Sequence, residues 1–147
     1  MIFYVSIDPG NKKCGMLLVD TNTRKVIEAR ISSIGGLSEL LSLWNENYLI
    51  SKIIIGNGTN SKYIENKLIP EKNYNLYFVN EKGSTLRARF RFWEIWPPNF
   101  FMRWLPKELL FPPENLDAIV ALILLEDFLN HKLIWPEKVN IKIWPEQ

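Results

Sequence analysis

The sequence predicts an α/β domain built on a mixed five-stranded sheet, with three antiparallel strands followed by parallel strand–helix units and helices on both faces. Two observations predict this class. The first three apolar runs follow one another across short turns, which is typical of antiparallel hairpins. The next two runs are each separated from the preceding one by a segment with helical spacing, which is typical of parallel crossovers. A chain of 147 residues, 47% of them hydrophobic, is the size of one domain.

The expected strands are short runs rich in β-branched and aromatic residues, bounded by turn residues. They fall at residues 2–7, 14–20, 25–31, 52–55 and 76–79. The turn Asp8-Pro9-Gly10-Asn11 ends the first strand, and Thr21-Asn22-Thr23 suits a hairpin between the second and third. The fourth strand runs into Gly56-Asn57-Gly58-Thr59.

The expected helices follow apolar residues spaced three or four apart. They cover about residues 37–44, 61–68, 85–93 and 116–133. Between the last two, residues 96–113 hold five prolines and five aromatic residues. Because proline lacks a backbone donor and stops regular elements, this stretch is predicted to be a long structured loop. The chain therefore divides into a domain over residues 1–133, with residues 93–113 as a Trp/Pro-rich insertion, and a tail over residues 134–147. The tail holds a β-like patch at residues 139–144, which the predicted sheet does not include.

Composition narrows the chemistry that is open to this chain. A single cysteine, Cys14, excludes an internal disulfide and a thiolate zinc cage, and a single histidine, His131, excludes sites with several histidines. A metal would have to be held by carboxylates, which favours hard ions such as Mg²⁺ or Mn²⁺. The net charge of +2 permits a polyanionic partner without requiring one. No leader or membrane segment is visible, so a cytoplasmic location is expected.

Three carboxylates fall at the ends of expected elements. Asp8 ends the first strand, Glu81 follows the fifth, and Asp117 lies in the first turn of the last helix. In open α/β sheets, sites form outside the carboxyl ends of the strands. Each residue also has a structural interpretation: Asp-Pro-Gly is a common turn, a glutamate after a strand is usually solvated, and an aspartate at a helix start favours the helix dipole. Taken together, they predict a site for divalent metal ions.

Three motifs resemble the RuvC-like and YqgF-like (RuvX) nucleases of the ribonuclease H fold. They are residues 5–15 (VSIDPGNKKCG), residues 79–85 (VNEKGST) with Ala88 and Arg89, and residues 112–118 (PPENLDA) with Ala121 and Leu125. The resemblance covers about residues 2–130. It implies a ribonuclease H-like fold and a metal-binding catalytic triad of Asp8, Glu81 and Asp117. Glu114 is then a candidate for the fourth acidic ligand that RuvC-type resolvases often carry.

The activity implied by this resemblance is Mg²⁺- or Mn²⁺-dependent cleavage of structured nucleic acid. The proposed roles of the family are processing of ribosomal RNA precursors and resolution of Holliday junctions. Either RNA or branched DNA would be the substrate. An alternative is a nucleic-acid-binding module that kept the fold and lost catalysis. A relative of the actin-like ATPases is disfavoured because the chain is too short for two lobes and has no second phosphate motif.

Several residues are candidates for contacts with nucleic acid. Lys12 and Lys13 follow Asp8 in its turn, and Asn57 and Lys62 lie at a glycine-rich strand-to-helix junction of the kind that can approach phosphate. Arg87 and Arg91 share one helix face beside aromatic residues. Solvated lysines, a plain tight turn and a solvated basic helix face are the respective alternatives. The aromatic residues of 96–111 are too many to leave exposed on a monomer, so they must pack on the core, on another subunit or on bases. Partial packing on the core, with a remaining exposed patch that pairs two subunits in a homodimer, is favoured.

Overall fold

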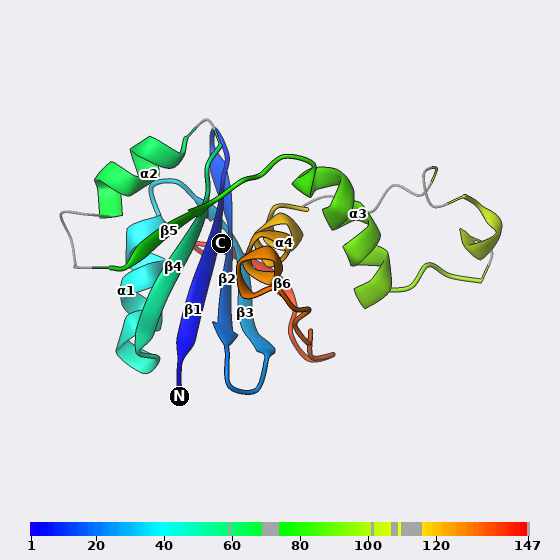
Figure 1. The fold of residues 1–147 in the computed structure, drawn as a ribbon, viewed down its shortest axis with the longest axis horizontal. Helices are drawn as coiled ribbons and strands as arrows, with labels where there is room; N and C mark the ends of the chain where they lie inside the picture. The colour runs from blue at the N-terminus through cyan, green and yellow to red at the C-terminus, as the bar shows by residue number, and fades with distance from the viewer. Residues whose placement is uncertain (59, 69–73, 101, 107–108, 110–115, 147) are drawn as a thin grey trace.

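The computed structural model describes all residues except 59, 69–73, 101, 107–108, 110–115 and 147. Its centre is one mixed sheet of six strands in the order β5-β4-β1-β2-β3-β6 (Figure 1). The strands are β1 (Phe3–Pro9), β2 (Lys13–Asp20), β3 (Lys25–Ser33), β4 (Ile50–Gly56), β5 (Leu76–Val79) and β6 (Ile141–Trp144). The first three strands pair antiparallel, and β4, β5 and β6 each join the sheet by parallel pairing.

The helices cover both faces of the sheet, as the sequence predicts (Figure 1). They are α1 (Leu37–Asn47), α2 (Ser61–Leu68), α3 (Ser84–Ile95) and α4 (Asp117–Leu129), and a 3₁₀ turn, η1, covers Met102–Trp104. Helices α1 and α2 pack on one face against alternate residues of β1 and β2. Helix α4 packs on the other face, and α3 packs against α4 on the side away from the sheet.

The predicted strand count of five is wrong by one, because the tail supplies a sixth strand. Residues 141–144 lie parallel to β3, with Ala29 opposite Ile141 and Ser32 opposite Trp144. The indole of Trp144 also donates a hydrogen bond to the carbonyl of Gly36 at 3.0 Å. These contacts tie the end of the tail to the start of α1.

The last helix is shorter than predicted. It ends at Leu129 because Asn130 adopts a left-handed conformation (φ 59°), which stops the helix. Within the helix, every residue from Ala118 to Glu126 is buried. A helix that is apolar on all sides must be covered on all sides. The sheet covers one side of α4 and α3 covers the other.

Candidate active site at the carboxyl end of β1

Asp8 lies in β1 directly opposite Gly15 of β2. Side chains alternate between the faces of a strand, so Asp8 is on the same face as Ser6, whose hydroxyl donates a hydrogen bond to the carbonyl of Ala121 in α4 at 2.7 Å. Asp8 therefore faces α4. The carboxylate is partly buried there.

Gly15 allows the first turn of α4 to approach Asp8. A Cβ atom at Gly15 would collide with the backbone carbonyl of Asp117 and with the amide nitrogen of Ala118. Only glycine leaves room for this contact between a strand and a helix start. The pairing of Asp8 with Gly15 thus brings Asp117 to the same place on the sheet as Asp8.

Glu81 reaches the site from the loop that follows β5. Its side chain lies over Gly56 and Gly58, where a Cβ atom would collide with the carboxylate. Asn57, between these glycines, makes two hydrogen bonds to the segment that carries Glu81. Its backbone amide donates to the carbonyl of Val79 at 2.9 Å, and its side-chain Oδ1 accepts from the backbone amide of Glu81 at 3.2 Å. The end of β4 therefore forms a cradle for the Glu81 side chain.

The pKa of Asp8 shows that the charges of the other two carboxylates reach this residue. Burial, the neighbouring Glu81 carboxylate and, more weakly, Asp117 raise the pKa of Asp8 to about 8. Burial also raises the pKa of Glu81 above its ordinary value. The thiol of Cys14, buried beside the site, has its pKa raised to about 12 by burial and then by the charges of Asp8 and Asp117. At neutral pH, without a cation at the site, Asp8 therefore keeps its proton.

The donor set fits a hard divalent cation. The carboxyl group of Asp8 lies near those of Glu81 and Asp117, whose charges raise its pKa. Glu81 Oε1 is buried without a hydrogen-bond partner, although a buried oxygen ordinarily has one. As they stand, however, no three His, Cys, Asp or Glu side chains in the part of the chain that the structure describes are arranged to hold a metal ion. The fourth predicted ligand, Glu114, lies outside the described residues. The metal site remains a prediction.

The predicted contacts with nucleic acid divide into two groups. Lys12, Lys13 and Lys62 are exposed at the same end of the sheet as Asp8, where a polyanion can reach them. Asn57 is exposed too, but its side-chain oxygen is committed to the Glu81 loop. Within the protein, the glycines of this junction make room for the Glu81 side chain. Contact of the junction with phosphate stays a prediction.

The two arginines of α3 have partners within the protein. Arg87 makes a bidentate ion pair with Asp127, with N–O distances of 2.7 and 2.6 Å. Arg91 pairs with Glu126 at 3.0 Å through two nitrogens and donates to the carbonyl of Leu133 at 2.8 Å. Arg91 is only 11% exposed. Both arginines therefore fasten α3 to α4, and a role for them in nucleic-acid binding stays a prediction.

Three features of the site went unrecognised in the sequence: the close approach at Gly15, the cradle of Gly56 and Gly58, and the hydrogen bond from Ser6 to α4. Gly15 gave a usable signal, because a glycine inside an apolar strand often marks a place where another backbone approaches closely. Ser6, a polar residue within an otherwise apolar buried strand, gave a second signal, because a buried hydroxyl needs a partner.

Comparison with known proteins supports the fold. No protein-family model matches the chain, and no curated protein matches it. Among solved structures, the chain is similar to the large terminase nuclease from the thermophilic phage G20c, with a TM-score of 0.55 and 12% identity over 86% of this chain and 81% of that one. Together with the mixed sheet, this likeness places the protein in the class with a ribonuclease H-like fold. These comparisons do not test whether the protein belongs to the YqgF-like or RuvC-like family.

Among the described residues, no helix is both long enough and apolar enough to cross a membrane.

Proposed function

We propose that the protein is a metal-dependent nuclease that hydrolyses phosphodiester bonds in structured nucleic acid. The observation that supports this most is the raised pKa of Asp8 at the carboxyl end of β1, which burial and the nearby charges of Glu81 and Asp117 cause. Proteins rarely keep three acidic groups close together in a partly buried place without a cation or a chemical task. The similarity in fold to a terminase nuclease agrees with this activity.

In this proposal, Asp8, Glu81 and Asp117 hold the metal ions, and Glu114 is the candidate fourth ligand. Divalent ions bound there would activate a water molecule and stabilise the leaving oxygen of the cleaved bond. The protein's own contribution is placement. Gly15 lets the α4 backbone reach Asp8, and the Gly56–Gly58 cradle fixes the Glu81 carboxylate. The Asn57 side chain holds the Glu81 backbone in turn.

Two substrates follow from the resemblance seen in the sequence: the ends of ribosomal RNA precursors and four-way DNA junctions. Both are structured polyanions, and the exposed Lys12, Lys13 and Lys62 suit either one. The proposal therefore covers RNA or branched DNA as substrate, with Mg²⁺ or Mn²⁺ as cofactor.

The test is cleavage of both substrates by the wild type and by Asp8→Asn, with each metal. Asp8→Asn keeps the shape of the side chain and removes its charge, so we expect binding to survive and the cleavage rate to fall by about a hundredfold or more. Glu46→Gln, at an exposed position in α1, is the matched control and should cleave as the wild type does.

Two results would contradict the proposal. Equal cleavage by Asp8→Asn and the wild type would place any activity elsewhere. A wild type that binds both substrates and cleaves neither would favour the alternative, a nucleic-acid-binding module that has this fold without catalysis.

A further inference from the structure

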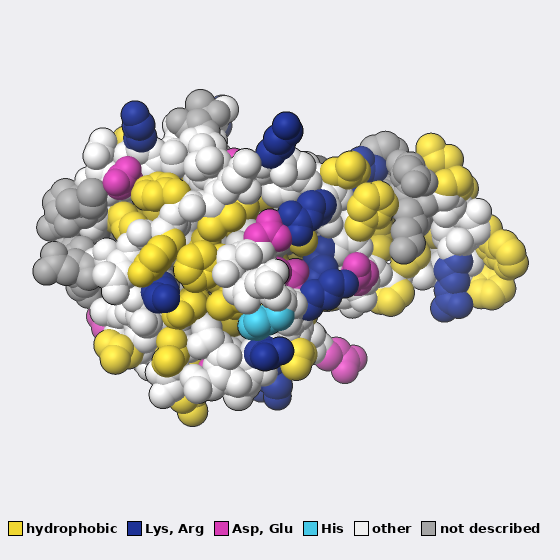
Figure 2. Space-filling model, viewed as in Figure 1, with side chains coloured by type: hydrophobic (Ala, Val, Ile, Leu, Met, Phe, Trp, Pro, Cys, Tyr) yellow, Lys and Arg dark blue, Asp and Glu magenta, His cyan; other side chains and the backbone are white. Residues whose placement is uncertain are grey.

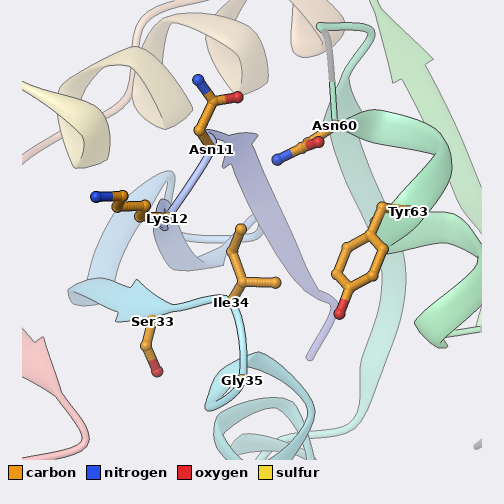
Figure 3. Close-up of a pocket in the computed structure, with 7 residues that line it drawn as sticks. All are labelled: Asn11, Lys12, Ser33, Ile34, Gly35, Asn60 and Tyr63. Atoms are coloured by element: carbon orange, nitrogen blue, oxygen red, sulfur yellow. The ribbon is translucent and has the colours of Figure 1, made fainter.

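A cavity of about 530 Å³ opens beside the turn that carries Asp8, on the α1/α2 face of the sheet. Its walls come from three separate segments: Asn11 and Lys12 of the β1–β2 turn, residues 33–35 at and just after the end of β3, and Asn60 and Tyr63 at the start of α2 (Figure 3). This volume is in the range of cavities that hold small organic ligands. None of the functions assigned above to Asp8, Glu81 or Asp117 uses this cavity.

The walls of the cavity are tied to one another. The side-chain amide of Asn60 donates a hydrogen bond to the carbonyl of Gly10 at 2.7 Å, which joins the start of α2 to the β1–β2 turn. The amine of Lys67 donates to the carbonyl of Ile34 at 2.9 Å, which joins the end of α2 to the segment after β3. The cavity is therefore a preformed part of the fold.

The chemistry of the lining suits a nucleotide. Tyr63 is 55% exposed. Its ring lies on the opposite side of Ile34 from Lys12, whose amine points outward, away from Tyr63 (Figure 3). An exposed ring offers a face on which a base can stack, and the exposed amine of Lys12 offers a cation for phosphate. Among the described residues that line the cavity, none is acidic, so nothing there repels a phosphate.

The cavity is also placed to receive the same strand as the carboxylates. Ile7 packs into the core under α1 and α2, whereas the next residue, Asp8, faces α4. The turn that follows leads from Asp8 to Lys12, so the cavity and the carboxylates lie on opposite faces of one sheet end. A nucleic-acid strand that crosses this end would meet both.

We propose that this cavity binds an unpaired nucleotide of the substrate strand, with its base stacked on Tyr63 and its phosphate paired with Lys12. This inference rests on the proposed nuclease function, because it takes the strand held at the carboxylates to be the ligand. It narrows the substrate class to nucleic acid with a single-stranded or splayed segment next to the cleaved bond.

The test is binding of fluorescent oligonucleotides to the full chain in EDTA, where cleavage does not interfere. The probes are a single strand, a fully paired duplex of the same sequence, and a mononucleotide. We expect the wild type to prefer the single strand over the duplex. Tyr63→Ala should weaken single-strand binding about 5- to 150-fold, the range found for lost base stacking, whereas Tyr63→Phe should bind as the wild type does.

Lys12→Ala should weaken binding of the single strand and reduce the slope of log K against log salt by about one unit. The matched control is Lys25→Ala, because Lys25 is an exposed lysine at the opposite end of the sheet. This variant should leave the affinity for the single strand and the salt slope unchanged. A strand that contains 2-aminopurine adds a direct readout, because stacking on Tyr63 should quench its fluorescence in the wild type and not in Tyr63→Ala.

The outcomes separate this inference from the nuclease proposal. If Tyr63→Ala and Lys12→Ala bind the single strand as tightly as the wild type, or if the wild type binds none of the oligonucleotides, the cavity inference is wrong. Loss of cleavage in Asp8→Asn would still support the nuclease. Weakened binding in both cavity variants, in a wild type that cleaves nothing, would support the cavity and contradict the nuclease. Binding of the mononucleotide alone would show a nucleotide site unconnected with a strand and would overturn the inference.

Discussion

Asp8 is the residue on which the proposed chemistry depends, and its environment has a consequence for stability. Its pKa is about 8 in the folded protein, against an ordinary value of 3.8. The folded state therefore holds a proton that the unfolded state releases. Stability from this group is fully present below about pH 4 and is lost as the pH rises through about 8.

In metal-free buffer, we expect the free energy of unfolding of the wild type to fall between pH 4 and pH 8 relative to that of Asp8→Asn. The difference should be on the order of a few kcal/mol across this interval, because each unit of pKa shift corresponds to about 1.4 kcal/mol. Urea unfolding of both proteins at several pH values, with EDTA present, measures it. Parallel pH profiles for the two proteins would show that Asp8 is not perturbed by its neighbours.

The close contact at Gly15 can be tested by a single substitution. A Cβ atom there collides with the backbone of Asp117 and Ala118, which cannot move as a flexible side chain would. Gly15→Ala should therefore cost about 1–3 kcal/mol of stability by overpacking and should displace Asp117 from Asp8. Gly35→Ala is the matched control, because a Cβ atom at Gly35 meets nothing within 4 Å. Thermal unfolding of the two variants should separate them clearly.

At the scale of elements, the attachment of α3 to α4 rests on two ion pairs of unequal burial. Arg91 and Glu126 are 11% and 8% exposed, whereas Arg87 and Asp127 are 51% and 31% exposed. Removing one partner of a buried pair leaves the other charge without compensation, which is far more costly than removing one partner of an exposed pair. Substituting each arginine of α3 in turn therefore compares the stability cost of losing a buried ion pair with that of losing an exposed one.

Arg91→Ala should lower the free energy of unfolding by about 3–5 kcal/mol, and Arg87→Ala by at most about 1 kcal/mol. Denaturant titration of both variants gives the two values. Similar losses would mean that Arg91 contributes no more than a surface residue. Arg87→Ala, which is expected to fold well, also lets the predicted role of Arg87 in nucleic-acid binding be measured without loss of structure.

The elements that the sequence predicted correctly are those with a local signal. Strands β1 to β5 and the four helices each follow an apolar pattern that is visible within a short stretch of the sequence. Strand β6 was not counted in the predicted sheet. Residues 139–144 have a β-like pattern, but their place in the sheet depends on pairing with β3, which is far away in the chain. The site also has a part that the sequence shows locally and a part that depends on the fold. Asp8, Glu81 and Asp117 could be chosen from their places at element ends. The fit of Glu81 over Gly56 and Gly58 depends on which strands become neighbours in the sheet.

At the scale of the whole molecule, the carboxylates couple metal binding to folding. A divalent ion that binds the folded protein and not the unfolded chain raises stability by mass action. Millimolar Mg²⁺ or Mn²⁺ should therefore raise the melting temperature of the wild type by about 3 °C or more. Asp8→Asn should respond much less. A wild-type melting curve that is indifferent to both metals would contradict the proposed metal site.

The segment after α3 extends away from the sheet and carries hydrophobic side chains at its far end (Figures 1 and 2). Phe100, Trp104 and Leu109 are all exposed, Trp104 by 80%. The homodimer stays a prediction, and burying these side chains against a second copy would remove them from water. Light scattering at micromolar concentrations should show a mass that rises with concentration, and Trp104→Glu should reduce this rise. A constant monomer mass in the wild type would contradict it.

The position of β6 also bears on how the chain is made in the cell. Gly36 and Trp144, which are joined by a hydrogen bond, are separated by 108 positions in the sequence. On a ribosome, the outer edge of β3 must therefore wait, with its hydrogen-bonding groups open, until nearly all of this sequence has emerged from the exit tunnel. An open strand edge can recruit a neighbouring nascent chain. Slow translation of residues 34–140 would lengthen this vulnerable interval, and a chaperone that shields β3 during synthesis would be expected to improve the yield of folded protein.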